Sequence, residues 1–500
     1  MQNRFFVKNI LFLLFLNLLI KPFWVLGIDR EVQNLIGGGG DLGYGIYNSV
    51  FSLTFLFYIL LDLGITSYNS RNIAQNSHLL SKYFFGITQI KLFLSLLYGV
   101  VIFVAGLIIG FRGSSLTILA WCGLNQMLLS LILFMRSNIQ GLLLFKVDGF
   151  LSVFDRLLAI AICSVLLWSG LFPRENFTIL WYLKAQTVAY ILTLALALYV
   201  VLRHTHQLSF KVNIPLFIAI LKQSMPYALL VLLMSFYSRL EPVLLVKLLP
   251  DDGDIQSGIY AQAYRLFDAG NNISYLFGVI LLPLFASMIK KGENIDSLVK
   301  VSFNIIVALI GMASILCIVY SDEIMRLLYT KLPSETTEGY DLRCQQVANT
   351  FQFLMVSFFA YSTTYVFGAL LTANGSLKQL NIIAASGVIL NVILNLILIP
   401  HFKAEGAACT SLCVQVFTAV IQFIVAKRIM KIDMDVKYWL QVVTFLILTT
   451  ATSIIIKRFN LNWKLGFATS LTINVGLVFA TRLVGISDVL ALFKAREKNE

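Results

Sequence analysis

Long apolar segments, separated by short polar breaks, recur along the whole chain. A bilayer core takes roughly 20 apolar residues per helical crossing, and windows of that length predict about fourteen membrane-spanning helices. The predicted helices cover residues 9–27, 43–66, 83–110, 115–135, 149–171, 177–202, 224–247, 258–289, 299–320, 345–372, 378–399, 406–426, 438–456 and 464–483. The pattern therefore predicts an all-α polytopic membrane protein.

The composition excludes a soluble globular domain. Of the 500 residues, 58% are hydrophobic and 13% are charged, whereas ordinary soluble domains contain about 25% charged residues. The first apolar run follows Arg4 and Lys8, as in a signal peptide, but no A-x-A-like cleavage site follows it. Because Lys21 and Pro22 lead into more apolar sequence, we expect this run to be an uncleaved first helix.

An internal repeat suggests how the helices are grouped. Residues 40–47 and 253–260 share the pattern G-D-[L/I]-x-x-G-I-Y, and Gly141 precedes Pro173 by the same spacing as Gly368 precedes Pro400. Such a duplication is typical of transporters. We expect two pseudo-symmetric six-helix lobes, residues 1–210 and 211–430, and two further helices within residues 431–500. Apolar residues spaced for one helical face predict an interfacial helix in the linker 203–222.

The basic residues of the loops predict the orientation. Lys and Arg gather in the loops 203–222, 289–300 and 427–437, which we place in the cytoplasm, and segment 321–344 then lies outside. An even number of helices places both termini in the cytoplasm. The net charge of +13 then reflects topology and contact with anionic membrane lipids, and nucleic acid is a poor explanation for it.

The sequence offers no catalytic or cofactor-binding motif. Gly37 to Gly40 lack the Lys-Ser/Thr that a phosphate-binding loop needs. His204 and His206 do not share a helix face, and no ligand joins Cys409 and Cys413 at metal-site spacing. We therefore expect no enzyme, no metal and no cofactor.

Charged residues inside the apolar segments are the candidate functional residues. Each costs about 2.5–3.5 kcal/mol at the membrane centre, so it usually faces a cavity or a partner. Lys91 and Asp62 fit a structural role, either near a helix end or as an internal ion pair, whereas a role in the transport cavity is favoured for Arg239 or Arg265. The set is Lys21, Asp62, Lys91, Asp155, Arg156, Lys184, Arg239, Glu241, Arg265 and Asp268.

Basic residues outnumber acidic ones in this set, six to four, which favours an anionic cargo. We expect a cationic cavity between the two lobes. The candidate substrate-binding residues are Lys21, Arg30, Arg156, Lys184, Arg239 and Arg265. The candidate ion-coupling residues are Asp62, Glu241 and Asp268.

Several segments resemble the Wzx-type polysaccharide biosynthesis proteins, which belong to the multidrug/oligosaccharidyl-lipid/polysaccharide (MOP) exporter superfamily. They are Leu18–Phe23, Gly27–Asn34, Gly43–Tyr47, Leu61–Ile65 and Arg71–Gln75. Pro400 followed by Glu405-Gly406-Ala407-Ala408 also resembles the start of that superfamily's twelfth helix.

The resemblance implies a MATE-like fold and a flippase of the bacterial cytoplasmic (inner) membrane. Its cargo would be an undecaprenyl-pyrophosphate-linked oligosaccharide, and a polysaccharide polymerase and a chain-length regulator are candidate partners. Three alternatives stay open: a cation-coupled drug or metabolite exporter, a lipid II flippase, and a membrane polymerase or glycosyltransferase. The two C-terminal helices disfavour the exporter. The lack of a large external loop or a sugar-nucleotide motif disfavours the enzyme.

Overall fold

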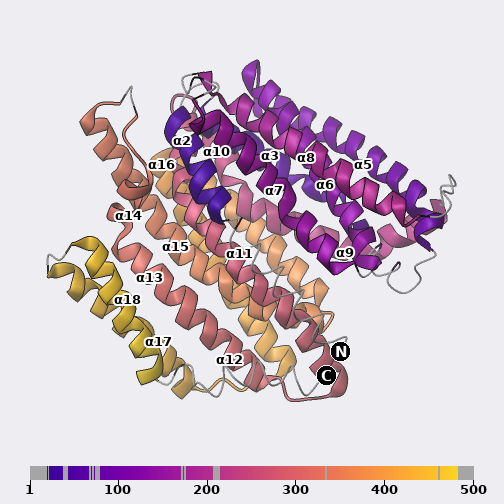
Figure 1. Ribbon diagram of the computed structural model, residues 1–500. Coiled ribbons are helices and arrows are strands. Elements are labelled where there is room, and N and C mark those ends of the chain that lie inside the picture. The colour runs from indigo at the N-terminus through magenta and orange to yellow at the C-terminus, as the bar shows by residue number, and fades with distance from the viewer. Residues whose placement is uncertain are drawn as a thin grey trace. The chain divides into compact units, whose positions relative to one another are not determined.

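The computed structural model describes the chain as a set of packed helices (Figure 1). The described residues are 20, 22–37, 43–66, 69, 73, 79–142, 144–170, 173, 176–205, 214–332, 335–459, 462–481 and 483. Within them no strand occurs, and ten helices are long and apolar enough to cross a membrane, or up to eleven if one bent pair counts as a span. The predicted class, an all-α multi-pass membrane protein, is confirmed.

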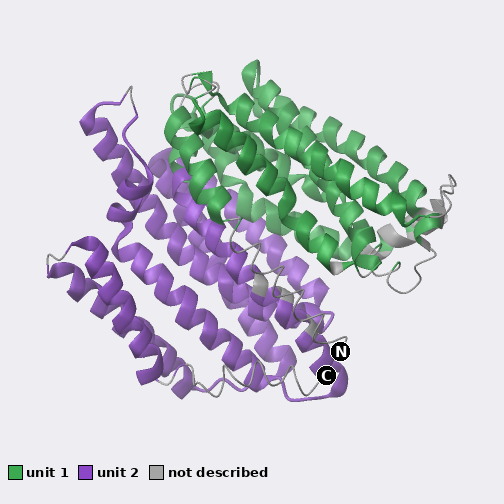
Figure 2. Ribbon diagram, in the orientation of Figure 1, with its two compact units in different colours: residues 1–261 green, residues 262–500 purple. Residues whose placement is uncertain are grey.

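The chain divides into two compact units, residues 1–261 and residues 262–500 (Figure 2). The first unit begins with a π-helix, η1 (Trp24–Asp29), and a short 3-10 helix, η2 (Tyr58–Leu61), lies further along. Its α-helices are α2 (Arg30–Ile36), α3 (Tyr44–Leu56), α5 (Leu79–Ile109), α6 (Ser114–Gly141), α7 (Phe145–Trp168), α8 (Ile179–Arg203), α9 (Ile214–Arg239) and α10 (Glu241–Leu248). The start of α11 (Gly253–Lys291) completes this unit.

Helix α6 is the central element of the first unit, because it packs against α3, α5, α7 and α8. Its buried face contains Ile118, Cys122 and Ile132 together with the polar residues Asn125 and Gln126. A buried polar side chain in a membrane protein contacts another helix or a cavity. The centre of this unit is therefore the place to look for a functional site.

The predicted helix 43–66 is broken in the structure. Helix α3 ends at Leu56, the 3-10 helix η2 follows, and Leu63 and Gly64 have φ angles of 47° and 82°. Asp62 then accepts a hydrogen bond from the backbone N–H of Thr66 at 3.2 Å. A short acidic side chain satisfies the open N–H groups where a helix begins, so the break is stabilised by the sequence itself.

The predicted segments 203–222 and 224–247 also differ from the structure. Part of the linker lies outside the described residues, but Ile214 to Arg239 form one continuous helix, α9, without a separate interfacial helix. The segment then bends by 49° at Leu240, between α9 and α10. The bend places Arg239 at the end of one helix and Glu241 at the start of the next.

The second unit contains the rest of α11 and the elements that follow it. These are α12 (Asp296–Ile306), the π-helix η4 (Val307–Gly311), α13 (Met312–Val319), α14 (Ser321–Leu328), α15 (Thr337–Ala373), α16 (Leu377–Met430), α17 (Val436–Arg458) and α18 (Trp463–Ala480). Helix α15 is central here, because it packs against α12, α13, α14 and α16. Helices α17 and α18 pack against each other and against α13.

Helix α16 covers two predicted spans, 378–399 and 406–426, and is interrupted between them. Lys403 has a non-helical conformation (φ 51°, ψ −128°), three residues after Pro400. A Cβ atom added at Gly406 would lie 2.4 Å from the carbonyl oxygen of Leu398. Gly406 is thus required by the close approach of the two halves of the helix.

The two copies of the repeat motif meet inside the first unit. Ser257 donates a hydrogen bond from its hydroxyl to the carbonyl oxygen of Gly45 at 2.9 Å, and Asn48 donates one to the carbonyl oxygen of Ser257 at 3.4 Å. The helix starts at Tyr44 and Gly253 therefore lie side by side. The division into two related lobes, residues 1–210 and 211–430, followed by residues 431–500, stays a prediction. The two compact units show how the chain packs, and packing does not test whether the lobes arose by duplication.

Candidate functional site: an arginine among aromatic rings

The first unit holds a half-buried cation, Arg156, among aromatic rings, with its side chain 27% exposed. The guanidinium carbon of Arg156, on α7, lies 5.4 Å from the ring centroid of Trp24 and 6.0 Å from that of Tyr190. Its Nε atom is 3.8 Å from the Asp155 carboxylate, which is longer than a hydrogen bond. We call Trp24, Asp29, Tyr47, Asp155, Arg156, Tyr182 and Tyr190 the aromatic–arginine cluster.

Asp29 organises the other half of this cluster. Its Oδ1 atom accepts hydrogen bonds from the hydroxyl groups of Tyr44 at 2.8 Å and Tyr182 at 2.7 Å. Tyr182 in turn stacks on Trp24, with centroids 5.6 Å apart, and meets the edge of Tyr47 at 5.8 Å. Asp29 is 1% exposed. It holds Tyr182, which in turn packs against Trp24, one of the two rings that contact Arg156.

A small cavity lies beside the cluster. Its volume is about 20 Å³ and its lining residues are Tyr47, Phe51, Cys122, Asn125, Gln126, Leu183, Gln186 and Tyr190. The amide nitrogen of Asn125 bonds the carbonyl oxygen of Leu183, and the Thr187 hydroxyl bonds Asn125 Oδ1. The buried Oε1 atom of Gln126 has no hydrogen-bond partner in the described part of the chain. A cavity of this size holds about one water molecule.

Two more of the predicted cations lie in this unit. Arg30 follows Asp29 directly, and its buried Nε atom has no hydrogen-bond partner among the described residues. Arg239 places its guanidinium carbon 5.1 Å from the ring centroid of Phe55 on α3. Arginine N–H groups held against aromatic rings, with water largely displaced, are suited to bind phosphate oxygens.

Four of the remaining predicted residues lie on α8, α10 and α11. Lys184 lies on the exposed face of α8, with its Nζ atom 5.1 Å from the Trp181 ring and 5.9 Å from the Trp121 ring. Glu241 is fully buried at the start of α10. Arg265 and Asp268 lie on α11 in the second unit. Lys21 lies outside the described residues.

Asp62, a predicted ion-coupling residue, is engaged by a buried lysine. The Nζ atom of Lys91 contacts the Asp62 carboxylate at 2.5 Å and the carbonyl oxygen of Leu61 at 3.0 Å. The hydroxyl oxygens of Ser130 and Thr66 lie 3.3 Å and 3.4 Å from the same nitrogen. Lys91 is 1% exposed, so it forms an internal ion pair and does not extend toward a membrane surface.

Sequence reasoning missed the aromatic half of the cluster. Trp24, Tyr182 and Tyr190 stand in apolar segments where aromatic residues are ordinary, and no local motif separates them from core residues. The spacing of Tyr182, Gln186 and Tyr190 by four residues places them on one face of α8. These three residues on one helix face, together with Arg156 inside another apolar segment, are the sequence features that could have identified the site.

The long apolar helices and the charged groups packed among aromatic rings within them define a polytopic membrane protein. The sequence matches the profile of the family described as polysaccharide biosynthesis protein over residues 33–289, which is more than half of the chain. The chain belongs to this family. A search of the curated proteins by sequence finds no significant match.

Solved structures support the fold assignment. The lipid II flippase MurJ in an inward closed conformation matches with a TM-score of 0.70 and 13% identity, covering 97% of this chain and 100% of that one. An inward-facing MATE family multidrug transporter matches with a TM-score of 0.60 and 14% identity, covering 83% of this chain and 94% of that one. A MOP superfamily transporter from Pyrococcus furiosus matches with a TM-score of 0.57, 13% identity and coverages of 85% and 94%. The MOP-type fold expected from the sequence is confirmed.

Proposed function

We propose that this protein is a flippase that moves an undecaprenyl-pyrophosphate-linked oligosaccharide from the cytoplasmic to the external leaflet of the bacterial inner membrane. The oligosaccharide is the repeat unit of an O-antigen, a capsule or an exopolysaccharide. The protein works by alternating access through a cationic cavity. It is not an enzyme, because the cargo changes leaflet without a change in its covalent bonds.

The proposal rests on the share of the chain that a solved flippase structure covers, taken together with the family to which the chain belongs. A lipid II flippase fold covers 97% of the chain, whereas a multidrug transporter fold covers 83%, and the family profile describes polysaccharide biosynthesis. A lipid II flippase moves a lipid-linked sugar. A related fold in a polysaccharide family favours cargo of the same chemical kind over a small drug cation.

The aromatic–arginine cluster supplies the binding chemistry. The pyrophosphate oxygens approach Arg156 and Arg30, whose guanidinium N–H groups bind phosphate in a bidentate manner. Asp155 lies 3.8 Å from Arg156 and compensates its charge in the empty carrier. Because Asp29 and Asp155 would repel the pyrophosphate, its binding requires both guanidinium groups, Arg156 and Arg30. Gln126, whose buried Oε1 atom has no hydrogen-bond partner among the described residues, lines the small cavity and offers an acceptor to a single hydroxyl group there.

The membrane potential is a sufficient source of energy for the loaded step. A cargo with a charge of about −2 gains roughly 4–5 kcal/mol per 100 mV when it leaves a negative interior. Return of the empty carrier is helped when a cation or proton neutralises an acidic residue, and Glu241 and Asp268 stay candidates. Asp62 is a weaker candidate, because Lys91 already neutralises it.

The test is leaflet transfer of a fluorescent polyprenyl-pyrophosphate oligosaccharide in liposomes, with and without an inside-negative potential. Removing one charge-assisted phosphate contact costs about 1.5–3 kcal/mol, so Arg156→Gln is expected to slow transfer about ten- to hundredfold. Arg112→Gln is the matched control, because Arg112 is exposed outside the predicted spans. If wild type moves no lipid-linked sugar but exports small organic cations, the multidrug-exporter alternative replaces this proposal.

A further inference from the structure

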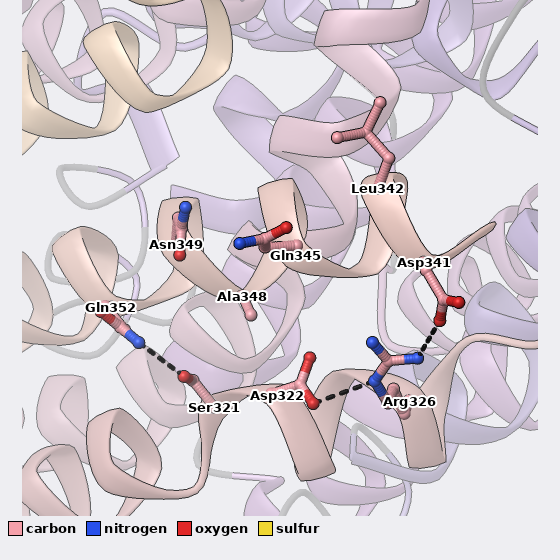
Figure 3. Close-up of a pocket in the computed structure, with 9 residues that line it drawn as sticks. All are labelled: Ser321, Asp322, Arg326, Asp341, Leu342, Gln345, Ala348, Asn349 and Gln352. Atoms are coloured by element: carbon pink, nitrogen blue, oxygen red, sulfur yellow. Dashed lines mark hydrogen bonds and ion pairs between the residues drawn. The ribbon is translucent and has the colours of Figure 1, made fainter. Parts of the chain in front are cut away.

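The second unit contains a polar cavity that the flippase mechanism does not use. Its volume is about 490 Å³, and it lies between the short helix α14 and the first turns of α15 (Figure 3). Its lining residues are Ser321, Asp322, Arg326, Asp341, Leu342, Gln345, Ala348, Asn349 and Gln352. The volume falls within the range of small-molecule sites, roughly 300–1,000 Å³.

The walls of the cavity are held rigidly by side-chain contacts. Arg326 bridges the two helices, with Nε 2.9 Å from Asp322 and Nη1 2.6 Å from Asp341. At the other end, the amide nitrogen of Gln352 donates to the Ser321 hydroxyl at 2.8 Å. Figure 3 shows these two bridges on either side of Ala348, with the side chains of Gln345 and Asn349 above it.

Hydrogen bonds outside the cavity also hold helix α14 in place. Lys457 on α17 donates hydrogen bonds to the carbonyl oxygen of Val319 at 2.6 Å and to Glu323 at 3.0 Å. The Tyr340 hydroxyl bonds the carbonyl oxygen of Tyr329, just beyond the end of α14. A cavity whose walls are already ordered needs little further ordering when a ligand binds.

The polar groups of the cavity include both acceptors and donors. Asp322 and Asp341 offer carboxylate oxygens, Arg326 offers N–H groups, and Gln345 offers both a donor and an acceptor. Asn349 offers its carbonyl oxygen, because its amide nitrogen already donates to Glu405 at 3.0 Å. Gln345 is exposed, and its side chain makes no hydrogen bond to the described part of the chain. A hydroxyl group both donates and accepts hydrogen bonds. A ligand with several hydroxyl groups can therefore bond to both the donors and the acceptors of the cavity.

The charges disfavour other ligands. Two carboxylates repel a phosphate or a uronic acid, and Arg326 repels a cation from the same space. The exposed side chain of Leu342, 59% exposed at the rim, offers an apolar surface to the C–H face of a sugar ring. We propose that this cavity binds a neutral saccharide.

The position of the cavity suggests the source of that saccharide. The orientation expected from the loop charges places segment 321–344 outside the membrane. The ligand is then the neutral part of the transported oligosaccharide, bound after the cargo reaches the external side. Naming the cargo as the source of the sugar rests on the proposed function. Binding of a free sugar to the cavity needs no transport.

Saturation-transfer NMR on the full-length protein in lipid nanodiscs tests the inference. The probes are a free neutral hexose, a 6-deoxyhexose, an N-acetylhexosamine and their disaccharides, with a hexuronic acid and inorganic phosphate as charged probes. At least one neutral sugar is expected to receive saturation. Gln345→Ala and Asn349→Ala are each expected to weaken its binding about tenfold, because hydrogen bonds to the ligand are lost.

Gln346→Ala is the matched control, because Gln346 is the neighbouring residue of the same type and does not line the cavity. Unchanged binding in this variant supports the inference. No transfer to any neutral sugar, equal binding by Gln345→Ala, or tighter binding of phosphate or the uronic acid overturns it. Sugar binding without leaflet transfer in liposomes contradicts the flippase proposal alone, and leaflet transfer without sugar binding contradicts only this site.

Discussion

Two basic residues lie deep in the first unit, and their surroundings differ. The ammonium group of Lys91 is within 3.4 Å of four oxygen atoms, from Asp62, Leu61, Ser130 and Thr66. Arg156 instead contacts the faces of Trp24 and Tyr190 and reaches its acidic neighbour only at 3.8 Å. Lys91 is surrounded by oxygen acceptors, whereas the neighbours of Arg156 are mainly aromatic rings, and Tyr190 is also its hydrogen-bond partner.

This difference distinguishes a charged residue that stabilises the fold from one that is able to bind a ligand. Lysine has three donors, and the oxygens around Lys91 are enough to occupy them, so an anionic cargo would have to displace protein groups. Guanidinium groups form cation–π contacts without using up their hydrogen-bonding capacity. The cation held by aromatic rings is therefore the better candidate to bind a phosphate.

The largest expected effect is the loss of Lys91. Lys91→Met leaves Asp62 without its cation in a mostly buried position at the broken helix, and breaking a buried ion pair costs about 3–5 kcal/mol. The variant is expected to show a large drop in thermal stability and in the yield of monodisperse protein. Thermal unfolding in detergent, followed by fluorescence-detected size exclusion, measures both.

The double variant Lys91→Met/Asp62→Asn is the control for this prediction. Removing both charges leaves no uncompensated ion, and such replacements are often close to neutral, so most of the lost stability should return. A Lys91→Met protein as stable as wild type would show that the pair does not hold the break in place, and the contrast with Arg156 would fail.

The next largest effect is expected from Arg156→Lys. Lysine keeps the positive charge but lacks the planar group that stacks on Trp24 and binds phosphate in a bidentate manner. We expect leaflet transfer to fall about tenfold, which corresponds to about 1.4 kcal/mol, while thermal stability changes little. Transfer at the wild-type rate would mean that charge alone suffices, and that the aromatic setting has no role in binding.

Much of the fold could be predicted because it follows from local pattern. Apolar length predicted the spans, and the G-D-[L/I]-x-x-G-I-Y repeat marked two helix starts that the structure brings together through Ser257 and Gly45. The break after Leu56 was missed, since the apolar pattern continues through it. Only Gly64 and the capping side chain of Asp62 distinguish it from an ordinary helix.

The candidate site was only half predictable. Depth in an apolar segment placed both Arg156 and Lys91 in the candidate set, and the expected structural role of Lys91 rested on its position near a helix end or in an ion pair. The partners that decide the cost of burying each charge are distant in sequence. Asp29 and Tyr182, for example, are 153 residues apart. Hydrogen-bond satisfaction is a property of the folded chain, and it is the property that separates the two cations.

A smaller effect is expected from Tyr182→Phe. The change removes one of the two hydroxyl groups that donate to Asp29 and leaves the stacking on Trp24 in place. Because Tyr44 still donates to Asp29, losing this one bond should cost only about 1 kcal/mol. Transfer should fall less than in Arg156→Lys, and Tyr199→Phe, an exposed tyrosine on the same helix, should leave transfer and stability unchanged. A larger loss of transfer than in Arg156→Lys would place the binding group at Asp29 and its tyrosines.

The smallest effect concerns an ion pair outside the predicted spans, which provides a contrast to both of these cations. Glu335 precedes α15 and receives two hydrogen bonds from Arg343, at 2.9 Å and 3.0 Å. Burial raises the pKa of its carboxyl group, but the bonds from Arg343 and the Leu332 N–H outweigh this and hold the pKa below its ordinary value of 4.5. The stabilisation is therefore complete above pH 4.5 and is lost as the pH falls through the lowered pKa. Because solvent screens this pair, its contribution is about 1 kcal/mol or less.

Thermal unfolding from pH 6 to pH 3 measures this contribution. The unfolding temperature should decline slightly less steeply in Glu335→Gln than in wild type, and identical profiles would show that the pair contributes no stability.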